Sequence, residues 1–399
     1  MAACVAPGDV TRAAASVETA WHTVRANLVC LSVRSGFDAL LGTLQLPAGS
    51  EVLVSALTIR DMTRIIEAHE LVAVPVDLDI QTLAVTRASL EHAISPRTRA
   101  LLVAHLYGSR MPMREFVDFS RKNNILLIED GAQGYTGDGW RGDVASDVCL
   151  FSFGPIKTAT ALGGAVMTFR DTALRDRVRA YMADWPMQRR AAYFARLLKY
   201  ALFVLLGYRP CYTLFVNAMR LFGFDHERVL ATSVRGFGSG ELFTKIRRRP
   251  ALPLLALLRR RIAQGLQPSV ALRSARARQL AAQLDGLLPA LERPGAMASW
   301  HSHWVFPIVH PRADALIAHL QARGFDATRG ASSMIVVSAT QGDVRASATE
   351  NAFAQLCYLP AHEGMSARDI ERLAAAVREF EAGTVVGDWR REPKNAVMR

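Results

Sequence analysis

The stretch VCLFSFGPIKTATALGGAVMTF, residues 148–169, places one lysine between two apolar segments. The first segment ends at the Gly154-Pro155 turn, Lys157 follows, and the chain becomes apolar again after Gly163-Gly164. Lysine is usually exposed, so a solvated turn is the ordinary interpretation of this pattern. A lysine held at the ends of buried strands has a different chemistry, because a desolvated amine can bond to a carbonyl carbon. The surrounding sequence decides between the two.

Apolar runs rich in β-branched residues recur before and within this stretch. They are NLVCLSV (27–33), EVLVSAL (51–57), LVAVPVDLD (71–79), ALLVAHL (100–106), ILLIED (125–130) and VCLFSF (148–153). Stretches with helical spacing, such as MREFVDFSRKNN (113–124), separate them. Strands that alternate with helices and are apolar on both faces predict an α/β fold, with a mostly parallel sheet covered by helices. In such sheets functional residues gather at the carboxyl ends of the strands, which here are RSG (34–36), ED (129–130) and FGPIK (153–157).

Length and composition are those of a folded protein with more than one domain. Half of the 399 residues are apolar and 21% are charged, so the chain can bury a large core. The five cysteines, at 4, 30, 149, 211 and 357, form no CxxC pair, which argues against a disulfide framework and is typical of a reducing compartment. The first 20 residues lack the pattern of a signal peptide, so we expect a cytoplasmic location.

The formal net charge of +12 is concentrated in one part of the chain. Residues 181–280 hold 18 Lys/Arg and 4 Asp/Glu, a net charge of +14, which leaves about −2 for the rest. Within them, residues 192–224 are strongly apolar with interspersed basic residues, and Arg209-Pro210 divides them. Their longest apolar run, Tyr200 to Tyr208, has nine residues, too few for a spanning helix of about 20.

This segment is predicted to form two short helices, and two interpretations of them stay open. The first is peripheral contact with an anionic membrane at its inner face. The second is a helical insertion that packs on its own domain or at a dimer interface. The neighbouring basic clusters KIRRRP (245–250) and RRR (259–261) lie among aliphatic residues and carry no zinc-finger or RNA-recognition signature, so no nucleic-acid partner is expected.

A second α/β region follows after about residue 285. It contains a predicted strand in HWVFPIVH (303–310), a helix in RADALIAHLQARGF (312–325) that ends at Gly324, and a helix in 366–383 with Ser366 as N-cap and Gly383 as C-cap. We therefore expect a large domain (1–185), a basic apolar helical insertion (186–245), and a linking helix with a small C-terminal domain (246–399).

The candidate site residues together match the needs of pyridoxal phosphate. Its ring nitrogen needs a carboxylate, its phosphate needs amides and hydroxyls, and its phenolic oxygen needs a polar neighbour. Asp130 ends a buried strand and Gln133 lies three residues further on. A strand, a tight Ser35-Gly36 turn and a helix start form a phosphate-binding geometry. Ser152 adds a hydroxyl.

These motifs resemble the DegT/DnrJ/EryC1/StrS aminotransferases, which are pyridoxal phosphate enzymes of fold type I that mostly aminate nucleotide-linked keto sugars. The resemblance covers about residues 28–380. Its strongest pieces are RTRALLVAHLYG (97–108), NNILLIEDGAQGYTG (123–137), FSFGPIK (151–157), GGAVMTF (163–169) and CYLPAHEGMSARDIERLAAAV (357–377).

The resemblance implies roles for individual residues. Lys157 would bond to the cofactor, Asp130 would bind its ring nitrogen and Gln133 would lie beside its phenolic oxygen. Ser35, Gly36, Phe37 and Ser152 would surround its phosphate. It also implies a homodimer, an amino acid donor such as glutamate, and a place in sugar or polysaccharide biosynthesis.

Several positions depart from the family pattern. The usual Gly-Thr-Ala is Gly36-Phe37-Asp38, which adds a carboxylate near the phosphate, and Ile59 stands where an aromatic ring usually stacks on the cofactor. The usual Gly-Glu-Gly-Gly is ALGG (161–164), and RRRPALPLLALL (247–258) lacks the expected Asn. These changes favour a rival interpretation, a non-catalytic scaffold or partner protein. The retention of Lys157, Asp130, Gln133 and Ser152 favours the enzyme.

Three histidines are candidates for other roles. His105, near a strand end, is interpreted as a structural hydrogen-bonding group, with an acid or base role as the alternative. His301 and His303 are expected to share one face of a strand, but no third ligand accompanies them, so the sequence predicts no metal site.

Overall fold

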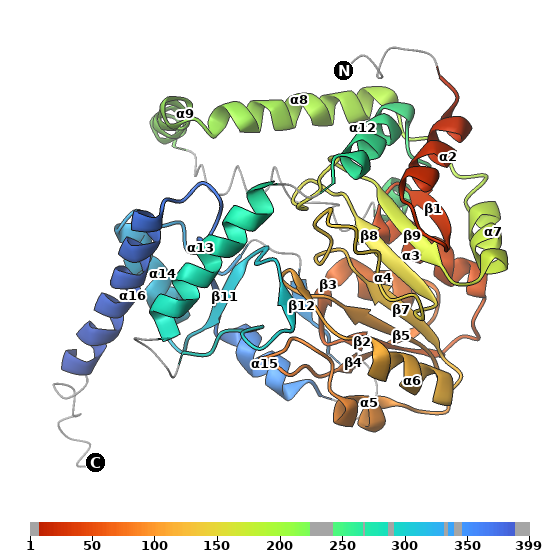
Figure 1. Ribbon diagram of the computed structural model, residues 1–399, viewed down its shortest axis with the longest axis horizontal. Coiled ribbons are helices and arrows are strands. Elements are labelled where there is room, and N and C mark those ends of the chain that lie inside the picture. The colour runs from red at the N-terminus through yellow and green to blue at the C-terminus, as the bar shows by residue number, and fades with distance from the viewer. Residues whose placement is uncertain are drawn as a thin grey trace, which may run out of the picture.

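A seven-stranded sheet forms the centre of the protein, in the order β1-β9-β8-β7-β5-β2-β4 (Figure 1). This computed structural model describes residues 8–223, 242–265, 268–285, 291–330, 334–338 and 345–387. The strands are β1 (Ala26–Cys30), β2 (Glu51–Ser55), β4 (Val72–Val76), β5 (Thr98–Ala104), β7 (Leu126–Asp130), β8 (Val148–Ser152) and β9 (Ala165–Phe169). Strand β9 is antiparallel to both of its neighbours, and β8, β7, β5, β2 and β4 pair in parallel. The prediction of a mostly parallel sheet is confirmed.

Helices cover both faces of this sheet because successive strand residues point to opposite sides. Val52 and Val54 lie in one core cluster and Leu53 in another. The first face is covered by α3 (Val33–Leu44), α4 (Arg60–Ala68), α7 (Thr172–Tyr181) and α11 (Leu242–Ile246). The other face is covered by α2 (Val10–Ala20), α5 (Arg87–Ala93), α6 (Arg114–Lys122) and α12 (Leu252–Ala263).

Helix α3 begins earlier than the sequence indicated. Ser32 is its N-cap, and its hydroxyl oxygen accepts a hydrogen bond from the Ser35 amide at 3.1 Å. Ser35 and Gly36 therefore lie in the first turn of the helix, and the prediction of a tight turn at these residues is wrong. Gly36 is needed for close packing instead, because a Cβ atom there would lie 2.4 Å from the Met167 sulfur on β9.

The small C-terminal domain has a hydrophobic core of its own, formed by two strands and three helices. Strands β11 (Phe306–Val309) and β13 (Leu356–Leu359) share a core cluster with α13 (Pro268–Asp285), α14 (Ala313–Ala322) and α16 (Ala367–Gly387). Helix α15 (Ser347–Ala354) precedes β13. Two short pairings join this domain to the large one: β12 (Met334–Val336) with β3 (Leu57–Ile59), and β10 (Trp300–His301) with β6 (Ser109–Arg110).

The predicted ends of the C-terminal helices are correct except one. Gly324 follows α14 with a φ of +81°, and Ser366 and Asp369 exchange hydrogen bonds at the start of α16. Gly383, however, is not a C-cap, since α16 continues to Gly387. One exposed glycine lowers helix stability by only about 1 kcal/mol, too little to end a helix whose next residues continue it.

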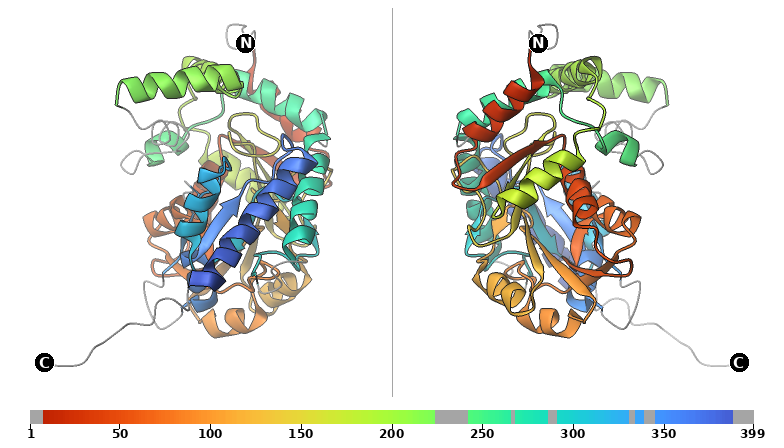
Figure 2. Two further views of the ribbon diagram at one scale, coloured as in Figure 1. Left: turned by 90° about the vertical axis from the view of Figure 1, so that its left-hand side faces the viewer. Right: turned by 90° about the vertical axis from the view of Figure 1, so that its right-hand side faces the viewer.

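The basic apolar segment forms α8 (Arg190–Leu206) and α9 (Arg209–Leu221), as predicted. Both lie at one end of the molecule (Figures 1 and 2). No single helix among the described residues has the length and apolar character to cross a membrane. In the described part of the chain, α8 combined with Pro210–Met219 meets these criteria as a pair, and this pair bends by 101°. Residues 224–241 of the predicted insertion lie outside the described residues. The limits of the three predicted domains stay predictions. Helices α11 and α12, which follow the basic apolar segment, pack on the core of the large domain.

His301 and His303 do not share a strand face, because β10 ends at His301 and His303 has a φ of +49°. Their rings stack with centroids 4.3 Å apart, and the His301 Nδ1 accepts a hydrogen bond from the His303 amide. Burial lowers the pKa of His301 to about 3 and that of His303 to about 4.

Candidate functional site

Lys157 lies in the loop that joins β8 to β9. The loop closes on Phe153, whose carbonyl oxygen accepts hydrogen bonds from the amides of Ala161 (3.0 Å) and Gly163 (2.9 Å). The Lys157 Nζ lies 4.4 Å from the centroid of the Trp304 ring, and the Trp304 indole donates a hydrogen bond to the Ile156 carbonyl. A residue near the start of the small domain therefore covers the lysine.

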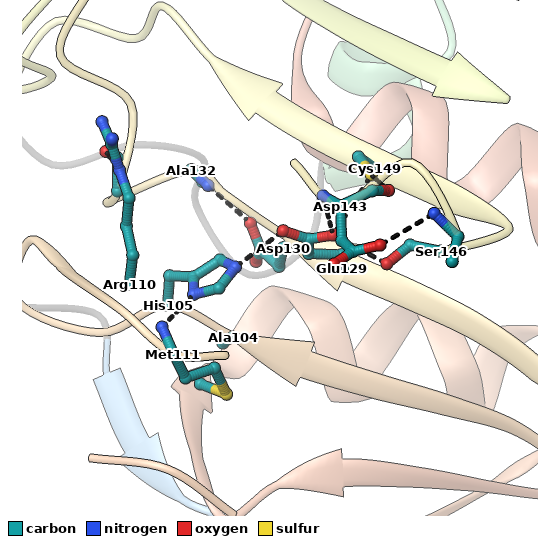
Figure 3. Close-up of polar contacts among 12 residues, drawn as sticks. Ala104, His105, Arg110, Met111, Glu129, Asp130, Ala132, Asp143, Ser146 and Cys149 are labelled. Atoms are coloured by element: carbon teal, nitrogen blue, oxygen red, sulfur yellow. Dashed lines mark hydrogen bonds and ion pairs between the residues drawn. The ribbon is translucent and has the colours of Figure 1, made fainter. Parts of the chain in front are cut away.

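Asp130 lies at the carboxyl end of β7, beside β8 in the parallel part of the sheet. The Ala132 amide donates a hydrogen bond of 2.9 Å to its carboxylate (Figure 3). Burial raises the pKa of Asp130, and the Ala132 hydrogen bond and the charge of Lys157 partly oppose this rise. The sequence argument that parallel strands bring Lys157 and Asp130 to one edge of the sheet is thus consistent with their electrostatic interaction.

The environment of Lys157 makes it an unusual lysine. Burial, together with the positive charge of Arg34, lowers its pKa from 10.5 to about 8 against the attraction of Asp130. At pH 7 a lysine with a pKa of 8 is neutral in about one molecule in ten, compared with about one in 3,000 for an ordinary lysine. A neutral amine is the nucleophilic form.

A buried, hydrogen-bonded pair of side chains, His105 and Glu129, lies beside Asp130 (Figure 3). His105 Nδ1 accepts a hydrogen bond from the Met111 amide, so Nε2 carries the proton and donates to Glu129 Oε1 at 2.9 Å. The other oxygen of Glu129 accepts from the Asp143 amide and the Ser146 hydroxyl. Burial alone would raise the pKa of Glu129, but these hydrogen bonds hold it below its ordinary value.

This geometry gives His105 a structural role. Both ring nitrogens bind protein groups, the residue is 1% exposed, and its amide donates to the Asp130 carbonyl. These contacts fix the end of β7 beside the end of β5, as the structural interpretation of His105 predicted.

The other residues singled out from the sequence lie in different positions. The Gln133 side-chain oxygen accepts a hydrogen bond from the Tyr107 amide at 2.8 Å, and Ser152 is partly buried at the end of β8. The Ser35 hydroxyl is bonded to the Ser32 hydroxyl at 2.8 Å. Phe37 is 0% exposed in the core cluster of α3, so its ring does not face the site.

The added carboxylate of Asp38 does not act as an uncompensated charge near the phosphate position, which corrects the expectation from the sequence. Its two oxygens accept hydrogen bonds from Arg247 (2.8 and 3.0 Å), and one also contacts His69 at 3.0 Å. Burial alone would raise its pKa, but these partners lower it. Arg247 comes from the basic segment in which the expected Asn is missing.

Two residues of the site were missed in the sequence. Arg34, in the first turn of α3, forms an ion pair with Asp61 at 2.6 Å and acts electrostatically on Lys157 and Asp130. Its position inside the RSG turn was a usable signal. Trp304 lies 147 positions after Lys157 in the sequence, and no local pattern links the two.

These groups fit pyridoxal phosphate. A partly desolvated amine interacts electrostatically with the partly buried carboxylate of Asp130, whose charge is costly without a cation nearby. Serine hydroxyls at 32 and 152 and the first-turn amides of α3 supply donors for a phosphate. Ile59, partly buried at the end of β3, offers no ring for stacking.

Comparison with known proteins identifies relatives of the large domain. Residues 12–201 match the DegT/DnrJ/EryC1/StrS aminotransferase family. The erythromycin biosynthesis sensory transduction protein EryC1 of Saccharopolyspora erythraea is 36% identical over 160 residues, or 38% of this chain and 43% of that protein. GDP-perosamine synthase of Caulobacter vibrioides is 30% identical over 158 residues, or 39% of this chain and 43% of that protein. The match thus spans less than half the length of these relatives.

Solved structures extend the likeness to both domains. The aminotransferase TlmJ from Streptoalloteichus hindustanus has a TM-score of 0.66 and 19% identity, over 94% of this chain and 90% of that chain. A DegT DnrJ EryC1 StrS aminotransferase from Brucella abortus has a TM-score of 0.66 and 18% identity, over 94% and 91%. The fold is therefore that of fold type I. Residues 12–201 of this chain, slightly less than half of its length, thus match the DegT/DnrJ/EryC1/StrS aminotransferase family.

Proposed function

We propose that this protein is a pyridoxal phosphate-dependent aminotransferase that moves an amino group from an amino acid to a keto sugar or a related carbonyl compound. The observation that carries the proposal is that Asp130 ends β7 and Lys157 follows the neighbouring parallel strand β8, where the two groups interact electrostatically and Lys157 has a pKa of about 8. When bound, pyridoxal phosphate supplies an aldehyde that bonds to amines and a cationic ring that withdraws electrons.

The residues of the chain divide the remaining work. Lys157 would bind the cofactor as a neutral amine, release it to the amino donor, and then take and return the proton at the donor Cα. Asp130, held by the Ala132 amide, would keep the ring nitrogen protonated. Gln133 would contact the phenolic oxygen. Ser152 and the start of α3, with Ser35 and Gly36, would bind the phosphate.

The names of two relatives support the choice of acceptor. GDP-perosamine synthase and a UDP-N-acetyl-3-dehydro-α-D-glucosamine 3-aminotransferase from Acidithiobacillus ferrooxidans match this chain at 30% and 34% identity. They support a keto sugar as acceptor, in sugar or polysaccharide biosynthesis. We propose glutamate as the donor, as the family resemblance implies. We infer further that the enzyme is a cytoplasmic homodimer in peripheral contact with an anionic membrane through residues 192–224.

A spectrum and an activity assay test the proposal. Pyridoxal phosphate added to the purified protein should give an absorbance band near the violet edge of the visible range. Lys157→Ala should abolish this band, whereas Lys122→Ala, at an exposed lysine on α6, should keep it. Amino transfer from glutamate should occur to at least one member of a panel of nucleotide-linked and lipid-linked keto sugars. A protein that takes up no cofactor would support the scaffold interpretation instead.

A further inference from the structure

The surface of α8 and α9 is apolar to a degree that its packing does not explain. Tyr193 is the buried residue of α8, yet one stripe of this helix points outward. Phe194, Leu198, Leu202 and Leu205 follow the i, i+4, i+8, i+11 spacing of one helix face and are 38%, 57%, 55% and 55% exposed. On α9, Leu214 and Leu221 are 73% and 82% exposed. Contiguous exposed apolar side chains of this kind mark an interaction site.

Charge indicates what covers this surface. Residues 189–222 contain six Lys/Arg and no Asp/Glu. A symmetric contact between two copies would bring the same basic segment against itself, and like charges would oppose it. An anionic bilayer instead attracts these side chains while their neighbours enter the headgroup region. Tyr208, at the bend between the helices and 62% exposed, is a residue type that favours the membrane interface.

The same helix is fixed to the loop that carries Lys157. The Tyr193 hydroxyl donates a hydrogen bond of 2.7 Å to the Ala161 carbonyl, and Arg196 donates one of 3.0 Å to the Leu162 carbonyl. These carbonyls lie four and five residues after Lys157 in the chain. A bilayer that holds α8 therefore also holds the lysine loop at its surface.

We propose that the outward face of α8 and α9 docks on an anionic bilayer, and that the enzyme thereby acts on a carbonyl acceptor carried by a lipid. The second half of this proposal rests on the aminotransferase activity proposed above. Docking confines enzyme and acceptor to one surface, which raises their effective concentration over that of a dissolved acceptor. The bend of 101° between the helices favours a position in the plane of the interface.

Vesicle sedimentation tests the docking surface. The full-length protein should sediment with phosphatidylcholine vesicles that contain 30% phosphatidylglycerol, and at least tenfold less with pure phosphatidylcholine. Leu198→Asp/Leu202→Asp should lower binding at least tenfold. The control Val144→Asp changes an equally apolar residue, 71% exposed outside the helix pair, and should bind like the wild type. Equal sedimentation of the double variant and Val144→Asp would overturn the proposal. It would also be overturned if the wild type bound no vesicles and the double variant lost its dimers, because the surface would then be a contact between two copies.

Activity tests the lipid-borne acceptor. With a soluble nucleotide-linked keto sugar, Leu198→Asp/Leu202→Asp should transfer amino groups within twofold of the wild-type rate. With a lipid-linked keto sugar in the anionic vesicles its rate should fall at least tenfold. Equal rates of the two proteins on the vesicle substrate would overturn the inference. Vesicle binding by a wild type that aminates no acceptor would instead refute the proposed function and leave the docking surface in place.

Discussion

Replacing Lys157 by methionine should stabilise the cofactor-free protein at neutral pH. Burial lowers the pKa of this lysine from 10.5 to about 8, so its charged form is held less well in the folded state than in the unfolded chain. The difference corresponds to about 3.4 kcal/mol, at about 1.36 kcal/mol per pKa unit. Because the residue keeps part of its surface exposed, we expect Lys157→Met to gain about 2 kcal/mol at pH 7.

The pH dependence distinguishes this effect from ordinary packing. The loss of folding stability caused by the charged Lys157 is complete below its folded-state pKa of about 8, because the folded and unfolded states then both hold the proton. It declines as pH rises from 8, since only the unfolded chain still binds the proton, and vanishes above the unfolded value of 10.5. The stability advantage of the methionine variant should therefore shrink to near zero at pH 10.5.

Urea denaturation of cofactor-free wild type and variant, at pH 7 and 10.5, measures this difference. Lys122→Met provides the control, because Lys122 is exposed on α6 and surface replacements change stability by less than about 0.5 kcal/mol. If Lys157→Met is no more stable than wild type at pH 7, or if its advantage is the same at pH 10.5, the lysine is not desolvated and the argument for its reactivity fails.

Three further changes test the surroundings of the site by urea denaturation. Glu129→Gln should lower stability by about 3 kcal/mol at pH 7, because an amide cannot replace all its buried hydrogen bonds, whereas Glu91→Gln, in an exposed pair, should change it by less than about 0.5. Since the folded pKa of Glu129 is lowered, its contribution is present above its unfolded value of 4.5, and the difference should shrink as pH falls through the folded pKa. Arg247→Met should cost about 2 kcal/mol by leaving Asp38 with His69 alone; Arg248→Met, which lacks that contact, is the control, and equal effects would contradict the pairing. Gly36→Ala should cost about 1–3 kcal/mol and weaken cofactor binding, whereas Gly383→Ala, with no atom within 4 Å of its added Cβ, should stabilise α16 by about 0.5–1 kcal/mol.

The central sheet could be predicted because its signals are local, and the same signals place Lys157 and Asp130 near neighbouring strand ends, while their roles at a cofactor stay predictions. Each strand is an uninterrupted apolar run, and parallel pairing brings strand ends together whatever lies between them. Asp130 and Lys157 were thus expected to meet although 27 positions separate them. The same reasoning places His105 beside Asp130, since β5 and β7 are neighbours.

Contacts that depend on the rotation of a helix or the docking of a domain could not be predicted in this way. The cap at Ser32 sets the phase of α3, and this phase buries the Phe37 ring and turns Asp38 toward Arg247. Moving the helix start by one residue would rotate each side chain by about 100°. Trp304 reaches Lys157 only because the small domain packs beside the lysine loop.

Two departures from the family pattern turn out to compensate each other. Asp38 and Arg247 lie 209 positions apart; from the sequence, Asp38 was an added carboxylate near the phosphate, and residues 247–258, which begin with Arg247, lacked the expected Asn. A buried carboxylate without a partner would be costly, but here it is paired with Arg247 and His69. Asp38 therefore no longer favours the scaffold interpretation, which keeps only the absent stacking ring and the absent acidic residue.

The remaining choice between enzyme and scaffold depends on how much folding stability the protein loses by desolvating Lys157. A scaffold has no use for an amine whose desolvation destabilises the fold, and an apolar residue at position 157 would relieve that cost. The enzyme needs this desolvation, because it raises the neutral fraction of the amine at pH 7 by a factor of about 300. A desolvated lysine that interacts electrostatically with Asp130 is thus expected of a working site, where stability is exchanged for reactivity.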